Sequence, residues 1–309
     1  MLYRVMDDRP IGLIAGNGQL PVLTARGIHA AGRRVACVGL ADQFDPQLPA
    51  CCDRFTKAGV IQLGKWIRVL RRLGCAEVIM VGGVCKARVY QPMRVWRQLP
   101  DWRAARLWYR VLRQDRRDQN ILAAVADELD HAGLHMIDST TYIPEHLATP
   151  GVLTRKRPTS EQMADVQFAW GILQQLADLD VGQAMAVKDR DIIAVEAIEG
   201  TDRMIDRAGA LCRSGKWTLL KSGGTRKDMR FDVPTIGVKT IERLKTAKAA
   251  CVALGPGVIM IDKPRVIEAA DKAGIAIIGV APPETPEPPE PPETPETPET
   301  PEAASSTSA

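Results

Sequence analysis

The stretch PIGLIAGNGQLP at residues 10–21 decides the fold class of this chain. Residues 10–15 form a short apolar run, the glycines of 16–18 predict a turn, and the pattern of 20–31 predicts a helix. A second strand is predicted at 33–39, which is apolar after its two arginines, so strand, helix and strand alternate. Continuous apolar strands that alternate with helices are typical of a parallel sheet covered on both faces.

The same alternation continues through the first part of the chain. Helical patterns at 66–73 and 120–132 accompany predicted strands at 77–81 and 134–138. These segments predict an N-terminal Rossmann-like domain with a parallel sheet, which we place at residues 1–140.

The remaining chain divides into three segments of different composition. Residues 141–158 are rich in proline and glycine and are interpreted as a linker. Residues 159–280 predict a C-terminal domain of mixed α/β structure. Residues 281–309 consist mainly of Pro-Glu and Pro-Glu-Thr units, which cannot bury a core, so we expect a disordered tail.

Antiparallel pairing is expected in the second domain. The runs at 183–187 and 191–196 are separated by three polar residues, which suits a hairpin. The runs at 250–254 and 258–261 flank a Gly-Pro-Gly turn and are interpreted as a second pair of strands.

The composition of the 309-residue chain narrows the class of protein. It has 41 basic and 37 acidic residues and a formal charge of +4, which does not indicate nucleic-acid binding. The seven cysteines include no C-x-x-C pair, which favours reduced thiols and a cytoplasmic location. No secretory signal pattern is present, and no apolar run reaches the roughly 18–20 residues that span a bilayer.

Two glycine turns that follow predicted strands are candidate substrate-binding sites. The first contains Gly16, Asn17 and Gly18, and the second contains Gly82 and Gly83. Backbone amides at such turns can hold a phosphate, but tight turns account for the first glycines equally well and for the second pair slightly better. A dinucleotide-dependent oxidoreductase is an alternative, although the third position of the G-x-G-x-x-G fingerprint holds proline here.

Residues 94–117 combine eight arginines with Trp96, Trp102 and Trp108. A helix is expected over most of this segment, and the favoured interpretation is an amphipathic helix with solvated arginines. A face that binds an anionic membrane is the second interpretation, and an RNA-binding surface is the third. Either of these would make the chain a non-enzymatic binding module.

An acidic cluster lies in AVEAIEGTD at residues 194–202, where an apolar run meets a Gly-Thr turn. Thr201 as a helix cap and Asp202 as an acid of the first turn account for two of its polar residues. Capping does not account for Glu196 and Glu199. Carboxylates at the end of a strand can hold a divalent cation and the phosphate bound to it.

The segment KSGGTRKDMRFDVPTIG at residues 221–237 carries further candidates. Lys221 ends a predicted strand, and Arg230 and Asp232 would share one face of an extended segment. Cations for phosphate together with an acid for metal or water suit the hydrolysis of a diphosphate. Gln183, at the start of the second domain, is a candidate ligand for a phosphate or a base.

Four motifs give this chain a resemblance to a known family. The segments at 12–21, 180–183, 195–202 and 230–237 resemble, in the same order, those of the LpxI-type UDP-2,3-diacylglucosamine diphosphatases. The resemblance covers about residues 10–280. The last three motifs together are specific, whereas the glycine turn alone is weak.

The resemblance implies an enzyme of lipid A biosynthesis. Such an enzyme hydrolyses the pyrophosphate of UDP-2,3-diacylglucosamine to UMP and 2,3-diacylglucosamine 1-phosphate with Mg²⁺ or Mn²⁺. The family has two α/β domains with the substrate between them, and the C-terminal domain would be catalytic. A transient contact with the inner membrane and assembly into a homo-oligomer stay open.

These arguments together give a predicted site. The expected catalytic residues are Asp232, Asp202, Lys221 and Arg230, and the resemblance gives Asp232 the strongest expectation. The expected substrate-binding residues are Gly16, Asn17, Gly18, Gly82, Gly83, Gln183, Thr201 and Thr235. The expected metal ligands are Glu196, Glu199, Asp202 and Asp232.

Overall fold

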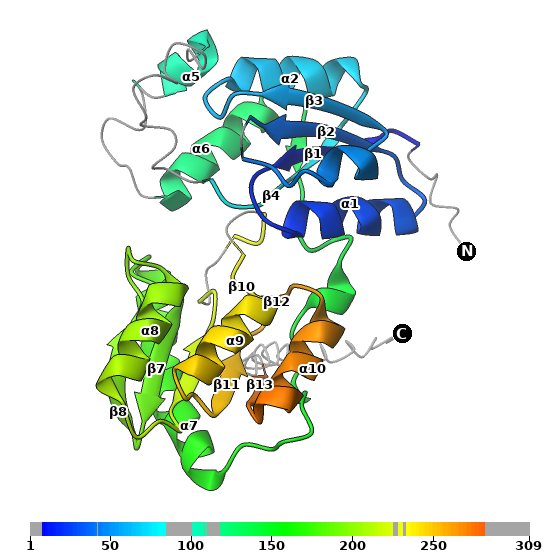
Figure 1. Ribbon diagram of the computed structural model, residues 1–309. Coiled ribbons are helices and arrows are strands. Elements are labelled where there is room, and N and C mark those ends of the chain that lie inside the picture. The colour runs from blue at the N-terminus through cyan, green and yellow to red at the C-terminus, as the bar shows by residue number, and fades with distance from the viewer. Residues whose placement is uncertain are drawn as a thin grey trace, which may run out of the picture.

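The computed structural model describes residues 8–41, 43–84, 101–107, 109, 118–224, 228–230 and 233–281. Within these ranges the chain forms two α/β domains, which lie one above the other in Figure 1. The Pro/Glu-rich segment from 282 onward, and most of the arginine- and tryptophan-rich segment, lie outside the described residues. No described helix is both long enough and apolar enough to cross a membrane.

The N-terminal domain is built on a five-stranded parallel sheet of order β3-β2-β1-β4-β5. Its strands are β1 (Ile11–Ala15), β2 (Val35–Leu40), β3 (Arg54–Ala58), β4 (Glu77–Val81) and β5 (His135–Met136). Its helices are α1 (Leu20–Ala30), α2 (Leu63–Arg72), α5 (Trp102–Leu107) and α6 (Asp118–Asp130). All residues of β1 and β2 are buried, as expected for central strands with both faces covered.

The helices cover the two faces of this sheet separately. Helix α1 packs with one apolar cluster, and α2, α5 and α6 pack with another. The predicted Rossmann-like parallel-sheet domain is therefore confirmed. Strand β3 was not expected from the sequence, because Arg54 and Lys57 interrupt its apolar pattern. Charged residues are tolerated there because β3 is the edge strand of the sheet.

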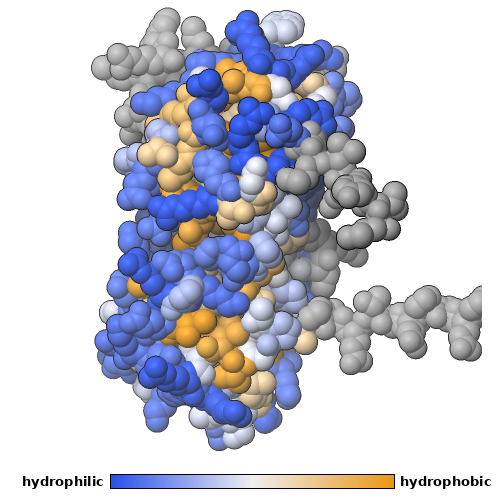
Figure 2. All heavy atoms as spheres, turned by 90° about the vertical axis from the view of Figure 1, so that its right-hand side faces the viewer, coloured by the Kyte–Doolittle hydropathy of each residue, from blue (hydrophilic) through white to orange (hydrophobic). Residues whose placement is uncertain are grey.

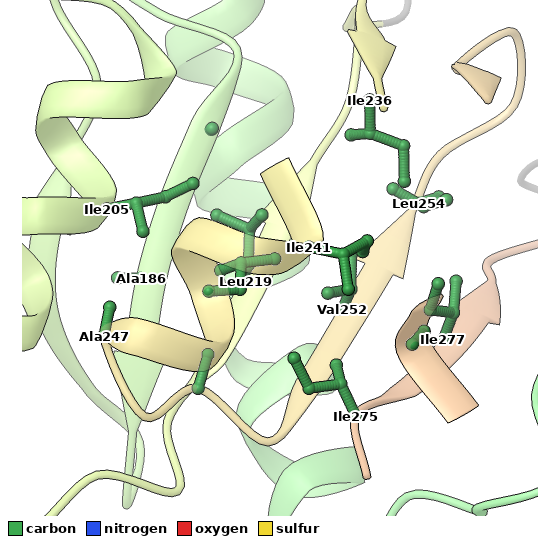
Figure 3. Close-up of a cluster of buried hydrophobic side chains, with 14 of the residues drawn as sticks. Ala186, Ile205, Leu219, Ile236, Ile241, Ala247, Val252, Leu254, Ile275 and Ile277 are labelled. Carbon is green, nitrogen blue, oxygen red and sulfur yellow. The ribbon is translucent and has the colours of Figure 1, made fainter. Parts of the chain in front are cut away.

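The C-terminal domain is built on a mixed six-stranded sheet of order β6-β13-β11-β9-β7-β8. The strands are β6 (Gly151–Val152), β7 (Ala184–Lys188), β8 (Asp191–Val195), β9 (Thr218–Lys221), β11 (Cys251–Leu254) and β13 (Ala276–Gly279). Helix α7 (Ser160–Asp178) covers one face, and α8 (Thr201–Leu211), α9 (Val238–Thr246) and α10 (Lys263–Ala273) cover the other. Figure 3 shows the core on the second face, where Ile205 and Ile241 point toward Leu219 and Val252.

The predicted hairpin of β7 and β8 is confirmed, and its turn has a clear backbone cause. Lys188 pairs with Asp191, so the loop consists of Asp189 and Arg190, whose φ angles are 54° and 58°. Two residues with positive φ give the turn that matches the right-handed twist of paired strands.

The predicted pairing of 250–254 with 258–261 is wrong. Strand β11 lies between β9 and β13 and is parallel to both. The second segment contributes β12 (Ile259–Met260), which pairs in parallel with β10 (Thr235–Ile236) in a separate two-stranded sheet. The apolar pattern of 258–261 reflects burial between the domains, since Ile259 is fully buried in the same cluster as residues of β1.

Apolar contacts therefore join the two domains. Ile259 belongs to the cluster that contains Ile11 and Leu13, and the partly buried Val233 and Ile261 pack against it. In Figure 2, seen from the right-hand side of Figure 1, hydrophilic side chains cover most of the molecule, and smaller apolar patches are visible on each domain.

Candidate active site

Three predicted site residues, Gln183, Glu196 and Lys221, come together at one edge of the six-stranded sheet. Strand β7 runs antiparallel to β8 and β9, so its start lies beside the ends of both neighbours. Ala184 pairs with Lys221, and the N–H of Ser222 donates to the carbonyl of Gln183 at 3.0 Å. The N–H of Glu196 donates to the carbonyl of Ala184 at 2.9 Å, which places the glutamate at this edge.

A chain of hydrogen bonds links three of the candidates. Lys221 Nζ donates to Thr201 Oγ1 at 2.6 Å, and Thr201 Oγ1 donates to Glu196 Oε1 at 2.8 Å. Lys221 is only 5% exposed, so the hydroxyl joins a buried ammonium to a carboxylate. Such charge-assisted bonds are stronger than those between neutral groups, and they fix the positions of both side chains.

The second carboxylate oxygen of Glu196 differs from the first, which accepts a hydrogen bond from Thr201. Glu196 Oε2 is buried and has no hydrogen-bond partner within the described part of the chain. A buried carboxylate oxygen without a donor is costly in free energy. This atom is therefore suited to accept a proton or a hydrogen bond, or to bind a cation.

Two glycines allow the backbone to bring these side chains together. Gly200 has a φ of 81°, which turns the chain between β8 and α8 so that Thr201 becomes the first helical residue. Gly182 packs so closely on the next strand that a Cβ there would collide with the carbonyl oxygen of Glu196. The Gly-Gln and Glu-x-x-x-Gly-Thr segments are thus one structural unit.

The other acids of the cluster face different partners. Glu199 accepts a hydrogen bond from Arg207, and Asp202 lies 3.7 Å from Arg243 with a side chain that is 63% exposed. The pKa of Glu199 is lowered, first by its own backbone N–H and further by Arg207. The structure therefore separates Glu196 from Glu199 and Asp202, which sequence proximity had grouped together.

The described acids provide a partial fit to a divalent cation. Across the described ranges, no three His, Cys, Asp or Glu side chains are grouped closely enough to hold a metal ion. Glu196 fits as a single ligand because of its unpartnered oxygen. Asp232, the fourth predicted ligand and the leading catalytic candidate, lies outside the described residues.

Arg230 lies at the junction of the domains. Its Nε donates to both carboxylate oxygens of Asp228 at 3.0 Å, and its Nη2 donates to Oδ2 at 2.7 Å. Arg230 Nη1 also lies 3.9 Å from Asp130 Oδ2 of α6, in the N-terminal domain. The hydrogen bond from Arg230 is the main cause of the lowered pKa of Asp228.

The same loop is held to the N-terminal domain by its backbone. The carbonyl of Met229 accepts hydrogen bonds from Ser139 N at 3.1 Å and from Ser139 Oγ at 2.9 Å. We name residues 228–230 and their partners Asp130 and Ser139 the interdomain clasp. Sequence analysis missed Asp228, Asp130 and Ser139; the spacing of Asp228 and Arg230 was the available signal, whereas the other two are distant in the chain.

The two glycine turns of the N-terminal domain meet each other. Asn17 N donates to the carbonyl of Gly83 at 2.7 Å, and Gly83 N donates to the carbonyl of Asn17 at 3.0 Å. A Cβ on Gly16 would lie 2.6 Å from the carbonyl oxygen of Gly83, and Gly82 has a φ of 91°. These glycines are therefore required by the close approach of two backbones, while the exposed Gly18 and Asn17 remain accessible.

Thr235 opens β10 and is partly buried beside the junction of the domains. Thus the candidate residues occupy three places. Gln183, Glu196, Thr201 and Lys221 form the sheet edge of the C-terminal domain; Arg230 and Thr235 lie toward the junction; and the glycine turns belong to the N-terminal domain.

The fold and this site define a two-domain α/β protein with a buried lysine–threonine–glutamate group at the sheet edge of its second domain. Comparison with family models gives matches to the LpxI N-terminal domain over residues 10–146 and the LpxI C-terminal domain over residues 149–278. The chain belongs to the LpxI family.

A known protein is similar to this chain over most of its length, and a solved structure matches it weakly. The protein called UDP-2,3-diacylglucosamine pyrophosphatase LpxI, from Caulobacter vibrioides, is 33% identical over 287 residues, which covers 89% of this chain and 99% of the relative. The biotin carboxylase domain of a single-chain bacterial carboxylase is 14% identical with a TM-score of 0.23. That match covers 66% of this chain and 34% of the other.

Proposed function

We propose that this protein is a UDP-2,3-diacylglucosamine pyrophosphatase of lipid A biosynthesis. The match of both domains to the LpxI family supports the proposal, as does the 33% identity to a relative that carries this name. The structural observation that carries it is the group of Lys221, Thr201 and Glu196, because a buried ammonium beside an unpartnered carboxylate oxygen suits phosphoanhydride hydrolysis.

The proposed reaction breaks the bond between the bridging oxygen and one phosphorus of the diphosphate. Water supplies the oxygen that replaces the bridging oxygen, and its protons pass to the protein and the products. UMP and 2,3-diacylglucosamine 1-phosphate are the expected products. Hydrolysis of this bond requires stabilisation of charge on the phosphoryl oxygens and an acceptor for a proton of the water.

The sheet edge provides groups for both tasks. Lys221 would stabilise negative charge on the diphosphate, and Thr201 holds the ammonium in place through its hydroxyl. Glu196 Oε2 would accept a proton from water or bind a cation. Asp232 is proposed as the principal catalytic acid or base because of its motif. Arg230, through its bonds to Asp228, is proposed to position the loop that leads to Asp232.

We propose that the reaction also requires a divalent cation, Mg²⁺ or Mn²⁺. Glu196 and Asp232 are the proposed ligands, since Glu199 and Asp202 already face arginines. When bound, the cation would neutralise charge on the diphosphate.

Substrate recognition is proposed to involve both domains. The backbone N–H groups of residues 16–18 already donate to Val81, Gly83 and the Asn17 side chain. The exposed side chain of Asn17, together with the turn at 82–83, would therefore contact the nucleotide or its phosphates. Gln183 and Thr235 would contact the substrate from the C-terminal domain. Because the substrate carries two acyl chains, we also propose that the protein meets it at the cytoplasmic surface of the inner membrane.

The test is the release of UMP from UDP-2,3-diacylglucosamine in detergent micelles by purified protein. We expect release with Mg²⁺ or Mn²⁺, and loss of release with a chelator. The variant Lys221→Ala should lose at least 100-fold in rate, the usual order of loss when one charge-stabilising group is removed. Lys239→Ala, an exposed lysine of α9, is the matched control and should keep the wild-type rate. Wild-type protein that releases no UMP with either metal would exclude the proposed reaction.

A further inference from the structure

A basic hollow lies on the outer side of the N-terminal domain, between α2 and α5. It has a volume of about 630 Å³, opens widely to solvent, and is lined by Arg68, Arg71 and Arg72 of α2 and by Trp102 and Arg103 of α5. In Figure 1 these two helices lie at the end of the molecule that is remote from the C-terminal domain. The sheet edge with Lys221 and Glu196 is therefore a different site.

Helix α2 presents its cations to solvent because its other face is in the core. Trp66 and Leu70 are buried, whereas Arg68, Arg71 and Arg72 are exposed. The helix contains no acidic residue that could neutralise them. Repulsion among three arginines on one face lowers stability, so core packing accounts for the position of the helix but not for the choice of charges.

The acids near the hollow leave most of this charge unbalanced. Asp101 accepts hydrogen bonds from the N–H groups of Lys65 and Ala104, so its carboxylate caps the first turns of both helices. Arg103 lies 3.6 Å from Glu128. Within the described part of the chain, Arg68, Arg71 and Arg72 form no ion pair.

An exposed aromatic side chain stands beside these arginines. Trp102 is 82% exposed, which is unusual for the largest apolar side chain. Tryptophan is favoured at the headgroup level of a membrane, where its ring is partly buried and its N–H stays hydrated. Arginine binds phosphate with two parallel hydrogen bonds and is favoured over lysine for this purpose.

We propose that the α2–α5 hollow binds the phosphate groups of anionic phospholipids and so docks the protein on a bilayer. The location leaves the sheet edge of the C-terminal domain uncovered. The volume of the hollow falls in the range of small-ligand sites. Lipid binding by the hollow does not depend on the proposed function. Only its biological role does, which is to hold the enzyme at the membrane where a diacylated substrate resides.

RNA is the other polyanion that arginine and tryptophan could bind. Proteins that bind single strands use several aromatic platforms along an extended groove. Among the described residues one tryptophan lines the hollow, and the whole chain has a charge of only +4, so the observations favour the lipid surface.

The test is co-sedimentation of the full chain with vesicles, without substrate. We expect binding to vesicles of phosphatidylcholine mixed with phosphatidylglycerol, no binding to phosphatidylcholine alone, and weaker binding at high salt. The variant Arg68→Ala/Arg71→Ala/Arg72→Ala should lose about 100-fold in partitioning, since each cation at an anionic surface contributes roughly a 5-fold factor. Trp102→Ala should lose several-fold.

Two further variants separate charge removal from other effects. Arg213→Ala/Lys239→Ala/Lys245→Ala removes three exposed cations of the C-terminal domain and should bind as the wild type does. Replacing the three arginines of α2 by lysine should retain part of the binding, because charge remains but paired hydrogen bonds are lost. Circular dichroism checks that each variant is folded.

Several outcomes would overturn the proposal. These are wild-type binding by the α2 triple alanine variant, equal binding to neutral vesicles, or RNA binding that the α2 substitutions abolish while vesicle binding persists. Release of UMP in detergent micelles should be unchanged in the α2 variant. Failure of that reaction in the wild type would refute the proposed function and leave the vesicle result standing.

Discussion

At the scale of single residues, the hydroxyl of Thr201 links the two charged groups of the proposed site. It accepts from Lys221 and donates to Glu196, so one atom orients an ammonium and a carboxylate. Without this hydroxyl each of the two charged groups would lose a hydrogen-bond partner, and both lie at the sheet edge where the chemistry is proposed.

The variant Thr201→Val removes this hydroxyl with little change in shape. We expect a loss of about 1–3 kcal/mol in unfolding free energy, because buried polar groups lose a partner, and a 10-fold or greater fall in turnover. Urea unfolding and UMP release measure the two effects. Thr201→Ser keeps the hydroxyl and should retain most of both. Turnover of Thr201→Val at the wild-type rate would remove the hydroxyl from the mechanism.

A second residue-scale prediction concerns Gly182, where an added Cβ would collide with the carbonyl of Glu196. Gly182→Ala should lower the unfolding free energy by about 1–3 kcal/mol, as overpacking does, and should also slow UMP release by displacing Glu196. Gly171→Ala in α7 has open space around the new methyl group and should raise stability by about 0.5–1 kcal/mol. Equal thermal stability of the two variants would contradict this packing argument.

At the scale of elements, the sequence predicted those strands that are buried on both faces. Strands β1 and β2 are continuous apolar runs, and β4 is apolar after Glu77; short apolar runs bounded by turn residues are typical of such strands. Strand β3 is interrupted by charges, and β10 and β12 have two residues each, too few to show any period. Their pairing is decided by contacts across the domains, which a local pattern does not contain.

The local sequence pattern also predicted only part of the candidate site. Gly-Thr after a strand correctly placed Glu196 and Thr201 where a strand meets a helix. The sequence could not show that Arg207 and Arg243 would engage Glu199 and Asp202, because these partners come from later turns and another helix. Acids that are close in sequence therefore diverged in space.

The interdomain clasp gives an element-scale prediction about pH. The folded-state pKa of Asp228 lies below its unfolded value, chiefly because Arg230 donates to it. Its contribution to stability is therefore present above the unfolded pKa of roughly 4 and is lost as the pH falls through the folded pKa. Arg230→Gln should be less stable than the wild type at neutral pH.

Urea unfolding at a series of pH values tests this sign. The difference in unfolding free energy between wild type and Arg230→Gln should shrink as the pH falls below about 4. A difference that stays constant from neutral to acidic pH would show that the pair with Asp228 does not contribute as proposed.

At the scale of the whole molecule, the two domains are joined through a shared apolar cluster. Ile259, which follows the linker by about a hundred residues, is fully buried with residues of β1. The candidate residues are divided between the domains, so the proposed mode of substrate binding requires a fixed relative position of the domains. The LpxI family models divide the chain near the same junction, between residues 146 and 149.

The variant Ile259→Ala tests this coupling. We expect a loss of about 2–5 kcal/mol, typical of a buried isoleucine, and a single calorimetric transition at a lower temperature because both domains lose a contact. Ile198→Ala, at a fully exposed position, should change stability by less than about 0.5 kcal/mol. Two separate transitions, with only one of them shifted, would show that the domains unfold independently.

The central claim is that the diphosphate is broken at the sheet edge formed by Glu196, Thr201 and Lys221. The most direct measurement is a crystal structure of the Asp232→Ala variant with UDP-2,3-diacylglucosamine bound. The account predicts that a phosphoryl oxygen lies within hydrogen-bond distance of Lys221 Nζ, with both domains in contact with the substrate. A diphosphate bound away from Lys221 and Glu196, with both side chains as they are without substrate, would contradict it.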